Sequence, residues 1–353
     1  MKALVFHGPA DIRYESYEDP GITDNRNMVI KVERCSICGS DLHMYHGDKI
    51  GPFDYSQPMD HFCTGHEAIG EVMEVGAAVR NHKVGDRVLV AGGTGCGECR
   101  RCRAGQVSIC ENPQIGRTTA YGISAGLQGV HADFLEVFNA DLGAHAIPEG
   151  VTDEQALLLT DALATGYHGV KSANISAGDV VAVIGQGPVG LMAAEAALAS
   201  GAAKVYAIDP QESRRNMAAR FGGIPLDPAN AVATIKEDTH GLGIDAVIEA
   251  VGLGPTLIQA VKLLRPGGRL AVLGILQPDT PIPLAAMQGK SITTFMGIAG
   301  VVDGWPDLIP LLQSGRIRAK GVFSHTFDLA DGAEAFRMFN AREDGVIKTM
   351  ITP

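Results

Sequence analysis

Short apolar runs separated by turn residues fill the first part of the chain. Three of these runs, at residues 28–32, 68–75 and 87–90, are rich in apolar and β-branched side chains and are bounded by Gly, Pro and Asp. Such runs are typical of β-strands between turns. The pattern therefore predicts a mainly β, barrel-like domain over residues 1–161.

Near residue 162 the pattern changes to nearly continuous apolar runs that alternate with amphipathic stretches. The runs lie at residues 180–184, 204–208, 244–250 and 269–273. Apolar runs of this kind are typical of strands buried on both faces of a parallel sheet. Stretches with helical periodicity lie between them, at residues 188–200, 212–221 and 255–264. This series predicts an α/β fold with a doubly wound, Rossmann-type parallel sheet over residues 162–299.

The last part of the chain, residues 300–353, has a mixed pattern. Helix-like stretches lie around residues 308–313 and 330–339, and a final strand is predicted at 346–351. We expect this tail to return to the first domain.

Composition and charge narrow the class of protein. The chain has 353 residues, 46% hydrophobic residues and a formal net charge of −11. It is long enough for two packed domains, and its acidic balance argues against a nucleic-acid partner, since such partners require clustered Lys and Arg. No apolar run approaches the length of a membrane span. We therefore expect a cytoplasmic protein without a membrane or nucleic-acid partner.

Four cysteines with the spacing C-x2-C-x2-C-x7-C lie in one stretch rich in Gly and Arg. Zn2+ takes four thiolates tetrahedrally, and short CxxC steps present successive sulfurs to one point. The arginines at 100, 101 and 103 are expected to offset the surplus negative charge. Two disulfides are the alternative, but residues 1–9 do not resemble a secretory leader. The spacing predicts a structural zinc lobe over residues 92–111, with the ligands Cys96, Cys99, Cys102 and Cys110.

A glycine motif follows the predicted strand 180–184 and opens the predicted helix at 188. Its first glycine permits a tight turn, its second permits close approach of a pyrophosphate, and its third permits close packing of helix on strand. The helix N-terminus adds free N–H groups and a positive dipole end. The motif predicts a dinucleotide site at Gly185, Gly187, Pro188, Val189 and Gly190.

An acidic residue, Asp209, ends the next predicted strand. A carboxylate there binds both ribose hydroxyls and repels a 2′-phosphate, so NAD is expected rather than NADP. Arg214 and Arg215 lie nearby and offer a second contact to the adenosine end. A solvated helix face is the alternative for both, and it is favoured for Arg215.

Further metal-ligand residue types occur in three separate motifs. They are CGSDLH from Cys38 to His43, GHE from Gly65 to Glu67, and TDALATGYHG over residues 160–169. Together with the four-cysteine lobe and the glycine motif, their order resembles the zinc-dependent medium-chain alcohol dehydrogenases over essentially the whole chain. The resemblance implies a GroES-like catalytic domain beside the Rossmann domain.

By this resemblance, an open catalytic zinc site is held by Cys38, His66 and Asp161, with Glu67 as an alternative ligand or a neighbour of the ligands. Three ligands leave one position for water or an alcohol oxygen. Asp161 as third ligand resembles the bacterial secondary-alcohol and formaldehyde-type branches, although the long insertion of the formaldehyde type is absent. Asp41 is expected to orient a zinc ligand.

The family resemblance also assigns roles around the metal. Ser40 takes the alcohol proton and passes it toward His43 through the cofactor ribose, and Thr165 contacts the nicotinamide ring. A helix N-cap is the alternative for Thr165. Lys348 is expected to pair with Glu67, with a surface lysine as the alternative. For Cys35, which forms a CxxC with Cys38, an inert core thiol is favoured over a redox dithiol.

The expected function is zinc-dependent, NAD-linked, reversible oxidation of a small or medium alcohol to a ketone or aldehyde. The cofactors are two zinc ions, one catalytic and one structural, and NAD. Polyol or butanediol-type dehydrogenases are alternatives, as is a zinc-stabilised NAD-binding redox sensor without turnover. Like other members of such a family, the chain is expected to form a homodimer or homotetramer.

Overall fold

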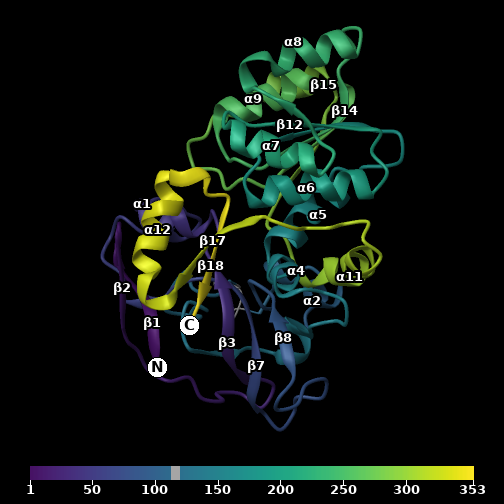
Figure 1. Ribbon diagram of the computed structural model, residues 1–353. Helices are drawn as coiled ribbons and strands as arrows, with labels where there is room; N and C mark the ends of the chain where they lie inside the picture. The colour runs from purple at the N-terminus through teal and green to yellow at the C-terminus, as the bar shows by residue number, and fades with distance from the viewer. Residues whose placement is uncertain (113–119) are drawn as a thin grey trace. The chain divides into compact units, whose positions relative to one another are not determined.

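The computed structural model describes residues 1–112 and 120–353, which form two compact units (Figure 1). The first unit contains Met1–Ala164 and Gly300–Pro353, and the second contains Thr165–Ala299. The chain thus leaves the first unit once and returns to it. In the described residues, no helix is both long enough and apolar enough to span a bilayer.

The second unit is built on a six-stranded parallel sheet with the order β13-β12-β11-β14-β15-β16. The strands are β11 (Val180–Ile184), β12 (Lys204–Ile208), β13 (Ile224–Leu226), β14 (Ile244–Glu249), β15 (Leu264–Val272) and β16 (Thr293–Met296). The four central strands coincide with the predicted apolar runs, because side chains on both faces of these strands are buried. The predicted doubly wound sheet is confirmed.

Helices precede and connect these strands. They are α5 (Ala162–Ser172), which begins in the first unit, α6 (Pro188–Ala199), α7 (Glu212–Arg220), α8 (Pro228–Asp238), α9 (Gly254–Leu263) and α10 (Leu284–Gly289). The hydrophobic pattern did not predict α8. Its start carries a local signal, because Asp227 accepts the N–H of Ala229 and Pro228 occupies the first turn.

The first unit is mainly β. Its larger sheet has the order β10-β8-β7-β3-β18-β17, with β9 also paired to β3, and a smaller sheet has the order β2-β1-β6. The strands are β1 (Lys2–Gly8), β2 (Asp11–Ser16), β3 (Met28–Ser36), β4 (Lys49–Ile50), β5 (Phe53–Asp54), β6 (Phe62–Cys63), β7 (Glu67–Val75), β8 (Arg87–Val90), β9 (Phe134–Val137), β10 (Ala144–Ala146), β17 (Phe323–Asp328) and β18 (Lys348–Thr352).

Six α-helices in the described part of the first unit complete it. They are α1 (Asp41–His46), α2 (Arg100–Arg103), α3 (Ala140–Gly143), α4 (Asp153–Leu159), α11 (Trp305–Gln313) and α12 (Gly332–Ala341). The strand pattern did not predict α4. Its signal is a capping box in which Thr152 and Gln155 exchange hydrogen bonds, followed by buried leucines.

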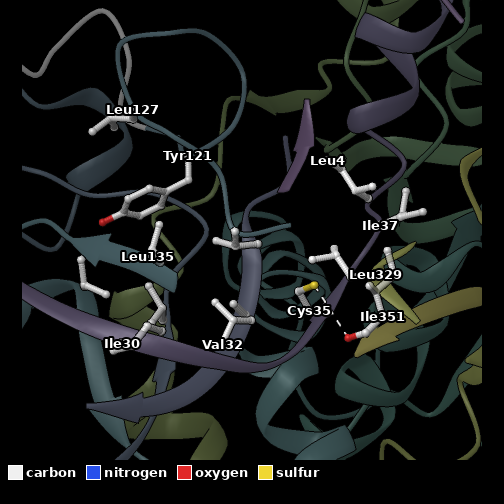
Figure 2. Close-up of a cluster of buried hydrophobic side chains, with 14 of the residues drawn as sticks. Leu4, Ile30, Val32, Cys35, Ile37, Tyr121, Leu127, Leu135, Leu329 and Ile351 are labelled. Carbon is white, nitrogen blue, oxygen red and sulfur yellow. Dashed lines mark hydrogen bonds between the residues drawn. The ribbon is translucent and has the colours of Figure 1, made fainter. Parts of the chain in front are cut away.

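The main core of this unit lies around Cys35 on β3 (Figure 2). The Cys35 thiol donates to the carbonyl oxygen of Ile351 on β18 at 3.7 Å, and the two residues are paired across the antiparallel strands. Burial raises the pKa of this thiol well above its ordinary value. All seven cysteines lie in the described residues as free thiols, so Cys35 is a core residue, as predicted.

Candidate active site and zinc centres

Three connections of the first unit bring the predicted catalytic ligands together. Cys38 follows β3, His66 precedes β7, and Asp161 lies between α4 and α5. Asp161 Oδ2 is 3.1 Å from Cys38 Sγ and 3.4 Å from His66 Nε2. Tetrahedral zinc bonds of about 2.0–2.3 Å place neighbouring donors roughly 3.3–3.8 Å apart. The spacing of these three donors is therefore close to that of a zinc site.

The turn that presents His66 depends on a glycine. Gly65 has a φ of +88°, and a Cβ there would lie 2.4 Å from Nε2 of His131. His131 is fully buried; its Nε2 donates to the Ser36 carbonyl at 3.1 Å, and Thr64 Oγ1 lies 2.9 Å from its Nδ1. The His131 ring thus fills the space beside Gly65 and holds the backbone that presents His66.

Asp41 lies behind the histidine, as predicted. Its Oδ1 is 3.2 Å from Nδ1 of His66, while its Oδ2 accepts the N–H of Cys38 at 2.9 Å. One carboxylate therefore contacts the rear of one donor residue and the backbone of another. Carboxylates in this position hold a histidine with its other ring nitrogen facing a metal.

Glu67 is the fourth member of the donor group, whose ligand atoms lie within 4.8 Å of one another. Its Oε2 accepts from Lys348 Nζ at 2.6 Å and from the Ser36 hydroxyl, and Lys348 also donates to the Ile37 carbonyl at 3.2 Å. Both charged side chains are completely buried. The predicted pair is confirmed, and among the described residues Oε1 of Glu67 has no hydrogen-bond partner.

The electrostatics of the donor group favour a cation. Burial and the Asp161 carboxylate raise the pKa of the Cys38 thiol to about 12. Burial opposes protonation of His66, yet the Asp41 and Asp161 carboxylates raise its pKa well above its ordinary value. A divalent cation among these donors favours the thiolate and the neutral imidazole, which reverses both shifts. One Cys, one His and carboxylates form a donor set that fits zinc.

Two predicted catalytic residues lie on or beside α1. Ser40 precedes the helix, and its Oγ is 3.3 Å from His66 Nε2, so it lies beside the donor group. Nδ1 of His43 is hydrogen-bonded to Asp48 Oδ2 at 2.7 Å, and the His43 side chain is 23% exposed. Thr165 lies on α5, as the first residue of the second unit.

The four-cysteine lobe is a second compact donor group, with all sulfurs within 4.8 Å of one another. Cys96 Sγ and Cys102 Sγ are 4.0 Å apart, against about 3.8 Å for tetrahedral Zn–S bonds of about 2.3 Å. Backbone N–H groups point at the sulfurs: Cys110 Sγ accepts from Cys96, and Cys96 Sγ accepts from Glu98 and Cys99. The donors fit a closed zinc site.

Two of the lobe's three arginines contact groups other than the sulfurs, and the predicted charge-balancing role of all three stays a prediction. Arg100 and Arg101 bind the Glu111 carboxylate at 2.8 and 3.4 Å, and Arg103 is exposed. Helix α2 directs these side chains outward, and backbone N–H groups of the lobe donate to the sulfurs. The N–H groups of Cys102 and Glu111 lower the pKa of Cys99 to about 6.

In the second unit, the glycine motif forms the predicted turn between β11 and α6. Gly185 has a φ of +88°, and a Cβ on Gly190 would lie 1.7 Å from the Gly185 carbonyl oxygen. Gly187 is the N-cap of α6, Pro188 occupies its first turn, and Val189 follows there. The backbone of the turn thus packs as closely against the start of α6 as the motif requires. In this motif the helix N-terminus faces a phosphate.

Asp209 joins the end of β12 to this turn. Its Oδ2 accepts the N–H of Gln186 and its Oδ1 accepts the N–H of Gln211, both at 2.8 Å. Arg214 approaches the turn, with Nη1 3.8 Å from the position of a Cβ on Gly187. The motif did not reveal Gln186, because its contribution is a backbone donor that any residue type carries.

Arg215 does not lie on a solvated helix face, contrary to the sequence expectation. Its Nη1 donates to the carbonyls of Asp209 and Pro210 at 2.7 and 2.8 Å and to Asp227 at 3.3 Å. The guanidinium satisfies carbonyls at the end of β12 and binds the N-cap of α8, so its partners lie within the protein.

Comparisons with known proteins agree with this geometry. The model described as alcohol dehydrogenase GroES-like domain matches residues 24–149, and the one described as zinc-binding dehydrogenase matches residues 188–314. A relative named "Probable zinc-binding alcohol dehydrogenase" in Mycobacterium tuberculosis is 40% identical over 356 residues, covering 100% of this chain and 89% of that protein. The chain belongs to the zinc-dependent medium-chain dehydrogenase family.

Solved structures of other proteins extend the similarity. Alcohol dehydrogenase TADH from Thermus sp. ATN1 superposes with a TM-score of 0.90 at 34% identity, covering 100% of this chain and 99% of that chain. The 2R,3R-butanediol dehydrogenase from Bacillus subtilis gives a TM-score of 0.80 at 30% identity, covering 100% and 99%. This dehydrogenase is therefore an enzyme with the α/β fold expected from its sequence.

Several residues around the donor group in this dehydrogenase were missed by sequence reasoning. His131 and Ser36 contact its supporting residues from positions far away in the chain, and no local pattern marks them. Asp48 had a weak local signal, since it follows a glycine, Gly47, a few residues after the motif that contains His43.

Proposed function

We propose that this dehydrogenase oxidises the carbinol carbon of a small or medium alcohol reversibly, with NAD as hydride acceptor. The observation that carries the proposal is the donor group of Cys38, His66, Asp161 and Glu67, in which Glu67 is already paired with Lys348. With Cys38, His66 and Asp161 as the three ligands, a coordination position is left for substrate. Zinc at this group supplies Lewis-acid polarisation of the substrate oxygen, and NAD supplies the hydride acceptor.

The residues around the metal ligands have separate roles in this proposal. Asp41 keeps Nε2 of His66 directed at the metal, and Lys348 neutralises Glu67 inside the core. The free Oε1 of Glu67 makes this side chain an alternative ligand or a close neighbour of the metal. Ser40 receives the proton that the alcohol loses, and His43 releases it to solvent. Thr165 as a contact of the nicotinamide ring stays a prediction.

The proton role of Ser40 gives a first test. Replacing Ser40 with Ala should lower kcat by about a hundredfold or more, the usual contribution of a positioned proton-transfer group. The helix should persist, because the Ser40 side chain makes no capping hydrogen bond to α1. Steady-state kinetics with a deuterated alcohol would show whether hydride transfer limits the rate. Ser40→Thr keeps a hydroxyl and serves as the control; wild-type kcat in Ser40→Ala would refute the role.

The preference for NAD is proposed from Asp209, with Arg214 as a further contact to the adenosine end. Each carboxylate oxygen of Asp209 accepts one backbone N–H and retains lone-pair capacity for a ribose hydroxyl. A 2′-phosphate would meet this negative charge at a site where Asp209 is 4% exposed. Like-charge contacts of this kind cost up to several kcal/mol.

Replacing Asp209 with Gly should therefore narrow the NAD preference, measured as the ratio of kcat/KM for NAD to that for NADP, by roughly tenfold to a hundredfold. Asp209→Asn keeps an acceptor for the Gln186 N–H and removes only the charge, so it separates repulsion from damage to the turn. Equal kcat/KM values for the two cofactors in the wild type would overturn the proposal.

The substrate class is tested by following NADH absorbance with a panel of primary alcohols, secondary alcohols, diols and polyols. Secondary alcohols and vicinal diols are the first choices, because a butanediol dehydrogenase is among the similar structures. If zinc-replete protein turns over none of these compounds, the proposed reaction is wrong.

We also propose that the chain assembles as a homo-oligomer. Strand β16 is at the edge of the parallel sheet and carries exposed Met296, and Ile298 next to it is 66% exposed. Apolar side chains beside an unpaired sheet edge favour pairing with a second copy.

A further inference from the structure

Asp48 lies directly beside the histidine that releases the proton. Its Oδ2 is 2.7 Å from Nδ1 of His43, and the two side chains are 33% and 23% exposed. We propose that Asp48 is a positioning residue that holds His43 with its proton on Nδ1, so that Nε2 accepts the proton arriving from Ser40. This inference rests on the proposed proton path.

Local backbone structure places Asp48 at this point. Helix α1 ends at Gly47, which has a φ of +78°; the N–H of Gly47 bonds to the Met44 carbonyl at 3.1 Å and the N–H of Asp48 to the His43 carbonyl at 2.8 Å. These two bonds form a Schellman motif, which turns the chain back over the last helical turn. Asp48 therefore returns to His43 through backbone bonds that do not involve its own side chain.

The far side of this turn is anchored in the core. The carbonyl of Asp48 accepts the N–H of Tyr55 at 3.1 Å, and Tyr55 is 2% exposed with its hydroxyl bonded to the Ile123 carbonyl at 2.8 Å. Between them, β4 and β5 form a short hairpin. Hydrogen bonds of both its own N–H and its own carbonyl therefore fix the backbone of Asp48, and this backbone sets the position of the carboxylate.

A second histidine near Asp48 has another partner. Nδ1 of His46 is 4.0 Å from Asp48 Oδ2, beyond hydrogen-bond distance, while its Nε2 is 2.6 Å from Oδ1 of Asn340 on α12. That amide oxygen accepts a hydrogen bond from the Nε2–H of His46, so neutral His46 has no proton on Nδ1 to offer Asp48. The hydrogen bond of Asp48 therefore belongs to His43.

The chemistry follows from the acceptor-only nature of a carboxylate. With Asp48 ionised, the proton of neutral His43 stays on Nδ1, and Nε2 keeps a lone pair. When Nε2 takes a proton, the resulting imidazolium is paired with Asp48, and the partly exposed ring transfers one proton to water. The ring is then again neutral with Nδ1 protonated, so one proton enters and one leaves per turnover.

The test compares Asp48→Ala with wild type in two measurements. In 15N NMR spectra of histidine-labelled protein, neutral His43 should carry its proton on Nδ1 in wild type and shift toward the Nε2-protonated form in Asp48→Ala. Where a deuterated alcohol shows a primary isotope effect, kcat should fall about tenfold with the KM values little changed. Asp54→Asn, which removes a carboxylate from the same hairpin, is the matched control and should change neither measurement.

A double variant separates this inference from the proton path itself. Adding Asp48→Ala to His43→Gln should lower kcat no further, because Asp48 acts through His43. Two results would overturn the positioning role while the proton path stands. One is an unchanged His43 spectrum in Asp48→Ala. The other is a kcat loss from Asp48→Ala that is as large on the His43→Gln background as in the wild type. If His43→Gln alone kept wild-type kcat, the proton path would be wrong, and the catalytic role of Asp48 would be wrong with it.

Discussion

Replacing Cys38 with Ser is expected to remove one of two zinc ions and nearly all turnover while the fold persists. A serine hydroxyl does not ionise at neutral pH and is a poor zinc ligand beside the Asp161 carboxylate, which is 3.1 Å from the Cys38 sulfur. Metal polarisation contributes several kcal/mol to such reactions, so kcat/KM should fall about a thousandfold or more. Metal analysis and circular dichroism on the same sample would measure zinc content and fold.

Cys35 provides the matched control for this experiment. It lies in the same CxxC, but its thiol donates to the Ile351 carbonyl in the core and is not part of the donor group. Cys35→Ala should therefore retain both zinc ions, whatever it costs in packing. One zinc ion per chain in fully active wild type, or full activity in Cys38→Ser, would contradict the assignment of two separate sites.

Replacing Cys99 with Ser is expected to lower stability strongly, with a smaller effect on the chemistry. Backbone N–H groups of the lobe point at sulfurs, and Cys99 is both a donor and the N-cap of α2. Structural zinc contributes about 10–16 kcal/mol in small zinc-finger peptides, and three remaining thiolates retain only part of such binding. A loss of roughly 3–4 kcal/mol corresponds to a fall in Tm of about 10 °C for a domain of this size.

The measurement is thermal unfolding with zinc content determined in parallel. Cys63→Ser is a suitable control, since Cys63 is a thiol of the same unit, more deeply buried than Cys99, that belongs to neither donor group. The Cys99→Ser protein that remains folded should still bind NAD, because the glycine turn of the dinucleotide site lies in the second unit. A Tm equal to wild type in Cys99→Ser would show that the lobe does not stabilise the protein through a metal.

Much of the second unit could be predicted from the sequence. The runs at 180–184 and 204–208 became β11 and β12 with the predicted bounds, because strands buried on both faces are apolar at their buried positions. The edge strands β13 and β16 were missed. Both strands contain exposed positions, so neither forms a continuous apolar run, and the hydrophobic pattern does not mark them as strands.

The candidate site was predicted in part. Spacing alone identified the four thiols of the lobe, and the three separate motifs supplied the residues that meet in the catalytic donor group. The Glu111 partner of two arginines in the lobe was not predicted, since their proximity in sequence did not show that α2 directs them toward this carboxylate. Arg215 was misjudged for the same reason, because its carbonyl partners are set by the turn after β12.

The sequence by itself determined the chemistry of this protein: which residue types are present, in what order, and with what spacing along the chain. Glycine turns, CxxC steps and buried strands are local properties, so they can be read from neighbouring residues. Only the tertiary structure decided which polar groups meet, such as which oxygen of Glu67 is paired and which, among the described residues, is free. Lys348 reaches Glu67 from the last strand, and the His131 ring lies beside Gly65. These contacts join residues far apart in the chain, where packing of the sheets, and no local rule, sets the distance.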